Sequence, residues 1–526
     1  MPIRSRKQEE TIGWLVRMTK LEDVLSSIER ERALNKPTSM TKVDLSNCGL
    51  TELPQELYHV ADSLEMLNLG GNSISALSDD FIKFKQLKVL FFAGNTFESV
   101  PPVLGRMASL NMLSFKSNKL KSIPEEALSP SISWLILTDN QLPMIPSSIG
   151  KLTSLRKCML AGNCLAELPE EMQNCKEIEL LRISDNKLTK LPKWLLTLPR
   201  LSWLAFSGNA LSSSSSSSSS GSTDDSVFQS TLTTATSNTL PKIDWKDLSV
   251  DNIVGEGASG VVYKAVWSGR SSTMASSSTG GDIDVALKFF KGAMTSDGSP
   301  ENEMEVISKI GNHPNFIPCF GRLDKCPADQ IGGADKEGLV FPLVSSDFYN
   351  ILGGPPSFDT CTRDTFPSAA DGGIKALFTL PYVLHVVVGI AAACLHLHST
   401  CGLLHGDIYA HNILVQHKAL PATLSDTKPA LLTDFGAAST APRELFTGDE
   451  MRLLERVEVR AFSCLIEDLL DNGDFIDTND NDTKTNAACV SRLRQLQGKC
   501  RVEQVEARPG FIDIISILQA ELSSLV

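Results

Sequence analysis

The segment His405-Gly406-Asp407-Ile408-Tyr409-Ala410-His411-Asn412, followed later by Asp434-Phe435-Gly436, decides how the C-terminal half of the chain is interpreted. Asp407 can orient or deprotonate a hydroxyl group, while Asn412 and Asp434 can supply the hard oxygen ligands that Mg²⁺ prefers. An acid followed by an amide is common by chance in soluble chains. The interpretation therefore depends on which motifs precede it.

Three glycines upstream, Gly255, Gly257 and Gly260, form the pattern Gly-x-Gly-x-x-Gly. A dinucleotide-binding fold is the usual competing interpretation, and it requires a helix directly after the third glycine. Here residues 261–267 have the composition of a second strand, which predicts a hairpin bridged by glycines. Backbone N–H groups with no side chains in the way can then approach phosphate oxygens.

A predicted strand ending in Lys288 comes next, and a predicted helix with Glu303 and Glu305 follows it. In this order the motifs resemble those of the eukaryotic protein kinases over residues 245–526. The resemblance implies a two-lobed α+β fold and the use of ATP. It also implies that Lys288 holds the α- and β-phosphates and pairs with Glu303 rather than Glu305.

The same resemblance assigns the other site residues. Asp407, Lys288 and Asn412 would be catalytic, and Asn412 and Asp434 would bind Mg²⁺. Phe341 would lie at the back of the adenine site. The residues expected around ATP are Gly255, Glu256, Gly257, Gly260, Val262, Ala286, Lys288, Glu303, Val344, Leu414 and Asp434.

Several positions depart from the kinase pattern. Gly406 stands where the family has an arginine. The chain therefore lacks the side chain that would bind a phosphate on the activation segment. Tyr409 replaces a lysine that neutralises charge on the γ-phosphate, which predicts slower turnover. Glu458 stands where an aspartate is expected, and Ala441-Pro442-Arg443-Glu444 lies too close to Gly436 to be the family's Ala-Pro-Glu. The nucleotide machinery is therefore predicted to be complete and the peptide-substrate machinery reduced.

The N-terminal half repeats the frame Leu-x-x-Leu-x-Leu-x-x-Asn-x-Leu in eight copies, with asparagine positions 22 to 24 residues apart. These positions hold Cys48, Asn72, Asn95, Asn118, Asn140, Asn163, Asn186 and Asn209. The pattern resembles the leucine-rich repeat family, whose short strands stack into one continuous core. The resemblance predicts an α/β solenoid in which the asparagines satisfy backbone groups at the turns.

Two variable positions of each repeat are expected on the concave face of the solenoid, and many of them are apolar. They are Met66, Val89, Met112, Trp134, Leu180 and Trp203 at one position, and Phe91, Ile136 and Met159 at the other. An apolar stripe with two tryptophans predicts a docking surface for a protein partner. Packing against the chain's own C-terminal half is an equally weighted alternative.

The remaining segments set the predicted boundaries. Residues 1–39 have apolar residues at helical spacing and are predicted to form a helical cap. The repeats occupy 40–211, a serine-rich linker 212–241 and the kinase-like domain 242–526. Nine consecutive serines in the linker cannot bury enough apolar area to fold alone.

Composition narrows the possible partners and compartment. A net charge of −13 argues against binding to nucleic acid or an anionic membrane, since both favour a basic surface. The 12 cysteines show no paired spacing, which favours reduced thiols and a cytoplasmic location. The longest apolar stretch, Leu380–Leu397, contains two histidines and is interpreted as a buried helix rather than a membrane span.

These features lead to one main hypothesis and two alternatives. The main one is an ATP- and Mg²⁺-dependent protein kinase acting on serine or threonine, with the repeats selecting partners in intracellular signalling. The second is a pseudokinase scaffold that binds ATP without effective phosphotransfer. The third is an adaptor that acts through its repeats alone, and the retention of Lys288, Asp407, Asn412 and Asp434 argues against it.

Overall fold

The computed structural model describes residues 6–33, 39–211, 240–257, 260–268, 281–292, 294–295, 297–324, 326, 337–344, 349–366, 378–416, 430–473, 475 and 480–525. The predicted linker lies almost wholly outside them. The chain forms two compact units, Met1–Leu201 and Ser202–Val526. The strand of the last repeat copy therefore belongs to the second unit.

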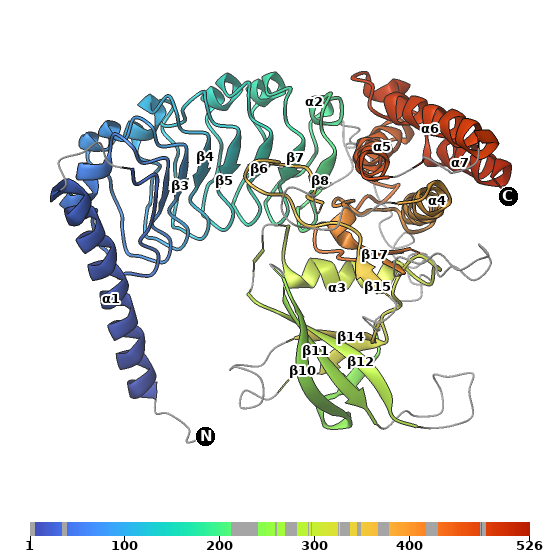
Figure 1. Ribbon diagram of the computed structural model, residues 1–526, viewed down its shortest axis with the longest axis horizontal. Helices are drawn as coiled ribbons and strands as arrows, with labels where there is room; N and C mark the ends of the chain where they lie inside the picture. The colour runs from blue at the N-terminus through green and yellow to red at the C-terminus, as the bar shows by residue number, and fades with distance from the viewer. Residues whose placement is uncertain are drawn as a thin grey trace, which may run out of the picture. The chain divides into compact units, whose positions relative to one another are not determined.

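The first unit is a row of short parallel strands, each one repeat apart, with helical turns along one side (Figure 1). Its strands are β1 (Lys42–Asp44), β2 (Met66–Asn68), β3 (Val89–Phe91), β4 (Met112–Ser114), β5 (Trp134–Ile136), β6 (Lys157–Met159) and β7 (Leu180–Arg182). The turns are η1 (Gln55–Val60), η2 (Asp79–Lys83), η3 (Pro102–Arg106), η4 (Ser147–Lys151), η5 (Glu170–Asn174) and α2 (Lys193–Leu196). The predicted N-terminal helix is α1 (Arg6–Ala33). The leucine positions of the frame point inward and form the core.

The repeat asparagines form the predicted hydrogen-bond ladder. Asn140 is buried; its Oδ1 accepts from the amide of Leu120 at 3.0 Å. Its Nδ2 donates to the carbonyls of Phe115 and Leu137 at 2.9 and 3.0 Å. Asn72, Asn95, Asn118, Asn163 and Asn186 make equivalent bonds. The prediction that they have a structural role is confirmed.

The concave positions of the first unit include one charged residue beside a tryptophan. The Nζ of Lys157, at the same repeat position as Trp134, lies 4.2 Å from the centroid of the indole ring. Trp134 is half-buried, and Met112 and Leu180 are buried. Trp203 does not belong to this unit. The stripe of apolar residues is thus divided between the two units.

The second unit begins with the last repeat strand, β8 (Trp203–Ala205), and continues into a six-stranded sheet in the order β10-β11-β12-β14-β13-β9. The sheet strands are β9 (Lys242–Asp244), β10 (Leu248–Glu256), β11 (Gly260–Trp267), β12 (Ile283–Phe290), β13 (Gly321–Asp324) and β14 (Gly338–Pro342). Antiparallel pairing of β10 with β11 confirms the hairpin predicted across the glycines. The sheet's core contains Val285, Leu287, Phe289 and Val340, and α3 (Pro300–Lys309) also belongs to this part.

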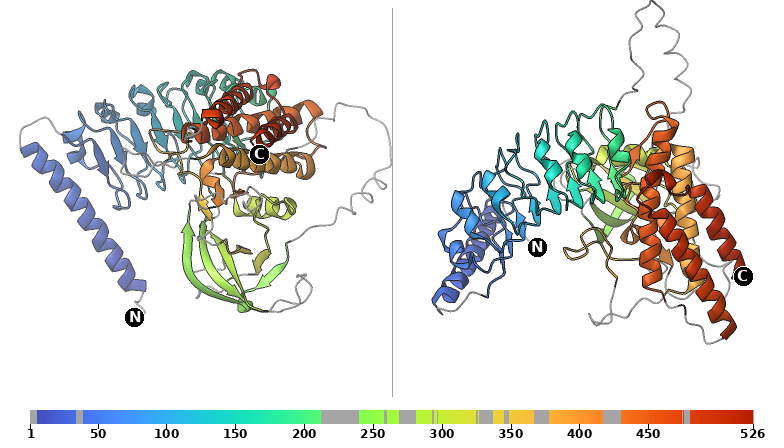
Figure 2. Two further views of the ribbon diagram at one scale, coloured as in Figure 1. Left: turned by 45° about the vertical axis from the view of Figure 1, so that its right-hand side comes forward. Right: turned by 90° about the horizontal axis from the view of Figure 1, so that it is seen from above.

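The rest of the unit is mainly helical, and its long helices lie side by side in both views of Figure 2. They are α4 (Leu380–His396), α5 (Gly448–Asp471), α6 (Asp480–Cys500) and α7 (Phe511–Ser524). The segment Leu380–Cys401 is long and apolar enough to cross a membrane by length and composition. However, α4 packs against α5 and α7 and buries most of its apolar side chains, as expected for a core helix.

Short strands hold the two motif segments close to this helical part. The 405–412 loop runs between β16 (Leu403–Leu404) and β17 (Ile413–Gln416). Asp434-Phe435-Gly436 lies between β18 (Leu431–Leu432) and β19 (Ser439–Thr440). Strand β17 pairs with β18 and with β15 (Tyr349–Ile351), and β16 pairs with β19. These ladders place the 405–412 loop beside the acid at position 434.

Candidate active site

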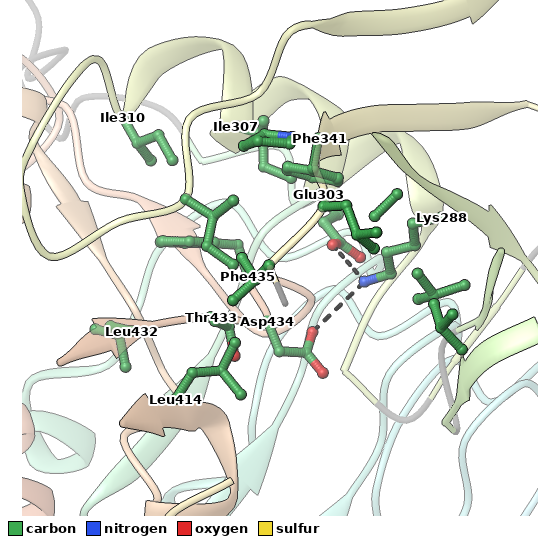
Figure 3. A pocket seen from close by; sticks show the side chains of 17 residues that line it. Lys288, Glu303, Ile307, Ile310, Phe341, Leu414, Leu432, Thr433, Asp434 and Phe435 are labelled. Atoms are coloured by element: carbon green, nitrogen blue, oxygen red, sulfur yellow. Dashed lines mark hydrogen bonds and ion pairs between the residues drawn. The ribbon is translucent and has the colours of Figure 1, made fainter. Parts of the chain in front are cut away.

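One lysine lies between two carboxylates at the centre of the candidate site (Figure 3). The Nζ of Lys288 on β12 is 2.6 Å from Oε1 of Glu303 on α3 and 3.8 Å from Oδ1 of Asp434. Glu305 instead pairs with Lys309. Burial alone would lower the pKa of Lys288, but Asp434 and Glu303 outweigh it and raise that pKa. The lysine is therefore held as a cation facing the pocket.

The backbone of Asp434 adopts a left-handed conformation, with φ of 55°. This conformation is uncommon for a residue with a side chain, and such outliers gather at functional sites. The carboxylate accepts from the amide of Gly436 at 3.2 Å, and its side chain is 43% exposed. Burial opposes ionisation of Asp434, but Lys288 and the Gly436 amide outweigh it and lower the pKa. An ionised oxygen ligand is thus presented to the pocket.

An apolar cavity of about 280 Å³ adjoins this cluster. Seven of the predicted residues line it: Val262, Ala286, Lys288, Glu303, Val344, Leu414 and Asp434. Phe341, Pro342 and Leu343 line it as well, from the end of β14 and the residues after it. Flat apolar walls with a cation and a carboxylate at one end suit a planar heterocycle that carries an anionic tail.

The glycine hairpin meets this cavity through Val262, which pairs with Gly255. A Cβ on Gly260 would lie 2.4 Å from the carbonyl of Phe289, so only glycine fits at that position. The amide of Gly257 donates to the carbonyl of Gly260 at 2.9 Å, and Glu256 forms an ion pair with Lys291 at 2.7 Å. Glu256 is thus engaged with a neighbouring lysine. Four of the predicted residues are not part of the cavity wall: Gly255, Glu256, Gly257 and Gly260.

The 405–412 loop brings the second acid and the amide together. The Nδ2 of Asn412 donates to Oδ2 of Asp407 at 2.7 Å and to the Asp407 carbonyl at 3.0 Å. This arrangement fixes the Asp407 carboxylate and leaves the Asn412 side-chain oxygen as an acceptor. The carbonyl of Asn412 accepts from the amide of Thr433, the residue before Asp434, at 2.9 Å. The loop is thereby tied to the lysine cluster.

His405 supports the loop as a neutral imidazole. It is fully buried, and burial lowers its pKa. Nε2 lies 3.1 Å from the carbonyl of Thr433, so it must be the protonated nitrogen. Nδ1 then accepts from the Asp407 amide at 3.3 Å.

Two acids that anchor the loop carry no recognisable sequence signal for that role. Oε1 of Glu458 on α5 accepts from the amide of Gly406 at 2.6 Å, while its Oε2 lies 2.5 Å from Nε2 of His398. Asp364 accepts from the amide of Ala410 at 2.5 Å and pairs with Nδ1 of His411 at 2.6 Å. In the sequence, Glu458 stands out only as a departure from the kinase pattern, and nothing near Asp364 indicates its role.

The residues present suit Mg²⁺ together with a nucleotide. The available donors are the Asp434 carboxylate and the Asn412 amide oxygen, which are hard oxygens. Lys288 adds the positive charge that a polyphosphate requires. Within the described residues, no group of three or more histidine, cysteine or acidic side chains forms a dedicated metal site. Magnesium would thus be held jointly with phosphate oxygens.

Comparison with known family models finds one match in each half of the chain. Residues 248–453 match the family model described as protein tyrosine and serine/threonine kinase, and residues 38–97 match a leucine rich repeat model.

Two curated relatives come from Dictyostelium discoideum. "Probable serine/threonine-protein kinase gdt2" is 24% identical over 37% of this chain and 9% of its own length. "Probable serine/threonine-protein kinase gdt4" is 27% identical over 33% of this chain and 8% of its own. The chain therefore spans less than a tenth of either relative. A solved Leptospira interrogans leucine-rich repeat protein matches 35% of this chain and 52% of its own, with 26% identity and a TM-score of 0.32.

Proposed function

We propose, on the premise that this chain joins leucine-rich repeats to a protein kinase domain, that it transfers phosphate from ATP to serine or threonine in a protein substrate. One observation carries the proposal above all others. Lys288 is held between Glu303 and Asp434 at the end of an apolar cavity, close to a loop in which Asn412 fixes Asp407. A chain that acted through its repeats alone would have no need of this charge arrangement.

The proposed mechanism assigns one task to each residue. Lys288 binds the phosphate oxygens, and Glu303 keeps its ammonium group in place. Asp407 orients the substrate hydroxyl and accepts its proton, while Asn412 holds the carboxylate in position. Asn412 and Asp434 would hold Mg²⁺, which would neutralise charge on the phosphates.

The alternative is a pseudokinase that binds ATP as a conformational signal. Tyr409 favours it, because no lysine stands at that position to stabilise γ-phosphate charge. The retained pair of Asp407 and Asn412 favours phosphotransfer.

The deciding experiment uses purified full-length chain with Mg²⁺ and radiolabelled ATP. We expect label on the chain or on a generic protein substrate, and its loss in Asp407→Asn. Asp359→Asn removes an exposed carboxylate from elsewhere in the same unit and is the matched control. Equal labelling of Asp407→Asn and the unaltered chain would contradict the assigned mechanism. Binding of ATP without any labelling would establish the pseudokinase.

The repeats are proposed to bind a protein partner in the cytoplasm. The support is the apolar character of concave positions such as Trp134, since aromatic residues dominate binding hot spots. Trp134→Ala should weaken binding of the partner by about 2 kcal/mol or more. Affinity purification of the partner from native lysate tests this prediction. The control is a thermal melt, which should show that the variant is as stable as the unaltered chain. Full recovery of the partner by Trp134→Ala would contradict the proposed docking surface.

A further inference from the structure

The last repeat copy contacts the 405–412 loop within the second unit. The indole ring of Trp203 stacks on the ring of Tyr409, with centroids 4.4 Å apart and planes 6° from parallel. Nε1 of Trp203 also donates to the carbonyl of Ile408 at 3.1 Å. Both contacted residues directly follow Asp407, and both tryptophan and tyrosine are buried. One side chain of the last repeat thus fixes the backbone and the side chain next to the proposed base.

The backbone of the same repeat makes a second set of contacts. The amides of Phe206 and Ser207 donate to Oγ of Ser439 at 2.8 and 3.2 Å. Ser439 is fully buried on β19, three residues after Gly436. These bonds satisfy amides that lie away from water, where an unmet donor is unfavourable. Strand β8 is thereby fixed at both of its ends.

The third contact explains why position 406 is glycine. Gly406 has φ of 73°, and a Cβ there would lie 2.8 Å from the carbonyl of Leu204 and 2.5 Å from that of Ala437. Any larger residue would displace β8 or the segment after Gly436. Two of the departures from the kinase pattern, Gly406 and Tyr409, are therefore positions that the last repeat contacts.

We propose that β8 is a built-in part of the 405–412 loop and that Trp203 is a positioning residue for Asp407. Trp203 acts through its contacts with Ile408 and Tyr409. These contacts limit the orientations available to Asp407. A small misalignment of a catalytic group lowers the rate strongly in a reaction that depends on positioning. The kinetic consequence rests on the proposed function, whereas the structural consequence does not.

The structural arm is hydrogen–deuterium exchange on the full-length chain, followed in peptides that cover residues 403–412. Trp203→Leu removes the stack and the donor, and we expect at least severalfold faster exchange in these peptides. Trp203→Phe keeps an aromatic ring and should restore most of the protection. Trp245→Leu is the matched control, since this half-buried tryptophan packs on the sheet core. Unchanged exchange at 403–412 in folded Trp203→Leu would overturn the proposal.

If Trp203→Leu does not fold, Ser439→Ala replaces it in the same measurement. This change removes the hydroxyl that accepts from Phe206 and Ser207 but leaves the stack intact. Faster exchange at both 203–207 and 403–412 is expected. Faster exchange at 203–207 alone would show that β8 does not support the loop.

The kinetic arm compares kcat with the KM for ATP. No residue of β8 lines the nucleotide cavity. We therefore expect Trp203→Leu to lower kcat about tenfold or more at unchanged KM, with rescue by Trp203→Phe. A rise in kcat would overturn the positioning role, because it would show that β8 obstructs substrate. If the unaltered chain shows no phosphotransfer, the proposed function fails while the exchange experiment still decides this inference.

Discussion

At the scale of single residues, charge balance at Lys288 decides whether the cavity accepts an anion. The ammonium group lies between Glu303 and Asp434, so it offsets one of the two negative charges that these carboxylates bring to the site. Without the lysine, the buried carboxylate of Glu303 and the partly exposed carboxylate of Asp434 would have no cation between them and the phosphates. Repulsion between like charges is strong where water is excluded.

The first prediction removes that charge. Lys288→Met should abolish ATP binding or weaken it strongly, because methionine keeps the length of the side chain but not its cation. Isothermal calorimetry on the full chain with Mg·ATP measures the effect. Lys309→Met, on the surface of α3, is the control and should bind ATP normally. Equal affinity in Lys288→Met and the unaltered chain would mean that the nucleotide site is assigned wrongly.

The second prediction separates backbone strain from crowding at two glycines of the same region. Gly402 and Gly406 both have positive φ, 63° and 73°. A Cβ on Gly402 would meet nothing closer than the Ala441 carbonyl at 3.4 Å, whereas Gly406 has two carbonyls within 2.8 Å. Gly402→Ala should cost about 1–2 kcal/mol from the left-handed backbone alone. Gly406→Ala should cost about 1–3 kcal/mol more, as overpacking does.

Thermal melts of the two variants test this difference. Equal shifts in melting temperature would show that Leu204 and Ala437 yield easily, and that position 406 is glycine for its backbone conformation only.

At the scale of elements, the repeats were predictable because their period determines their structure. One leucine frame fixes which side chains face inward, and one asparagine per copy fixes the turn. Each relation connects residues at most one repeat apart, so it can be read from a single sequence. The hairpin across Gly255 and Gly260 was predictable for a similar reason, since both strands are contiguous with the glycines.

The supports of the 405–412 loop were not predictable by this route. Trp203 and Ile408 are 205 residues apart in sequence, and Asp364 and Ala410 are 46 apart. Nothing in the local sequence of Trp203 or Asp364 indicates a partner in the loop. The repeat pattern predicts one continuous concave stripe, but Trp203 packs on Tyr409 and so takes part in a contact within the second unit. A shared repeat position therefore does not imply a shared role.

The third prediction concerns the asparagine ladder. Asn140→Ala leaves the Leu120 amide and the carbonyls of Phe115 and Leu137 without this partner inside the solenoid. The two carbonyls keep their bonds from Asn118 and Asn163, so the Leu120 amide is the group left unmet. The expected loss of stability is about 1–3 kcal/mol, the cost of one unmet buried donor. Urea unfolding of the full chain measures it. Asn111→Ala, which removes an exposed asparagine, is the control; an equal change in both would argue that the ladder contributes little.

At the scale of the whole molecule, the segment after Gly436 makes contacts that stabilise the second unit. Ser439 accepts two amides of the last repeat, and Thr447 begins α5. The amide of Glu450 donates to Oγ1 of Thr447, and the Glu450 carboxylate accepts from the Thr447 amide at 2.8 Å, which forms a capping box. The hydroxyls of Ser439 and Thr447 in this segment already make structural hydrogen bonds.

The last prediction follows from these contacts and from Gly406. A phosphate orders a loop when an arginine can clamp it, and position 406 offers no side chain at all. A phosphate on Thr447 would instead meet the Glu450 carboxylate and disrupt the cap of α5, which is worth about 1 kcal/mol. Activity, if the chain is a kinase as proposed, should therefore remain within about twofold after phosphatase treatment.

The measurement compares turnover before and after treatment, with mass spectrometry to establish that phosphate has been removed. Thr440→Ala and Thr447→Ala serve as companions, since both should retain turnover while Thr447→Ala lowers thermal stability. A large loss of turnover on dephosphorylation would show that a phosphate is bound by some group other than the missing arginine, and that the segment is a switch rather than a fixed support.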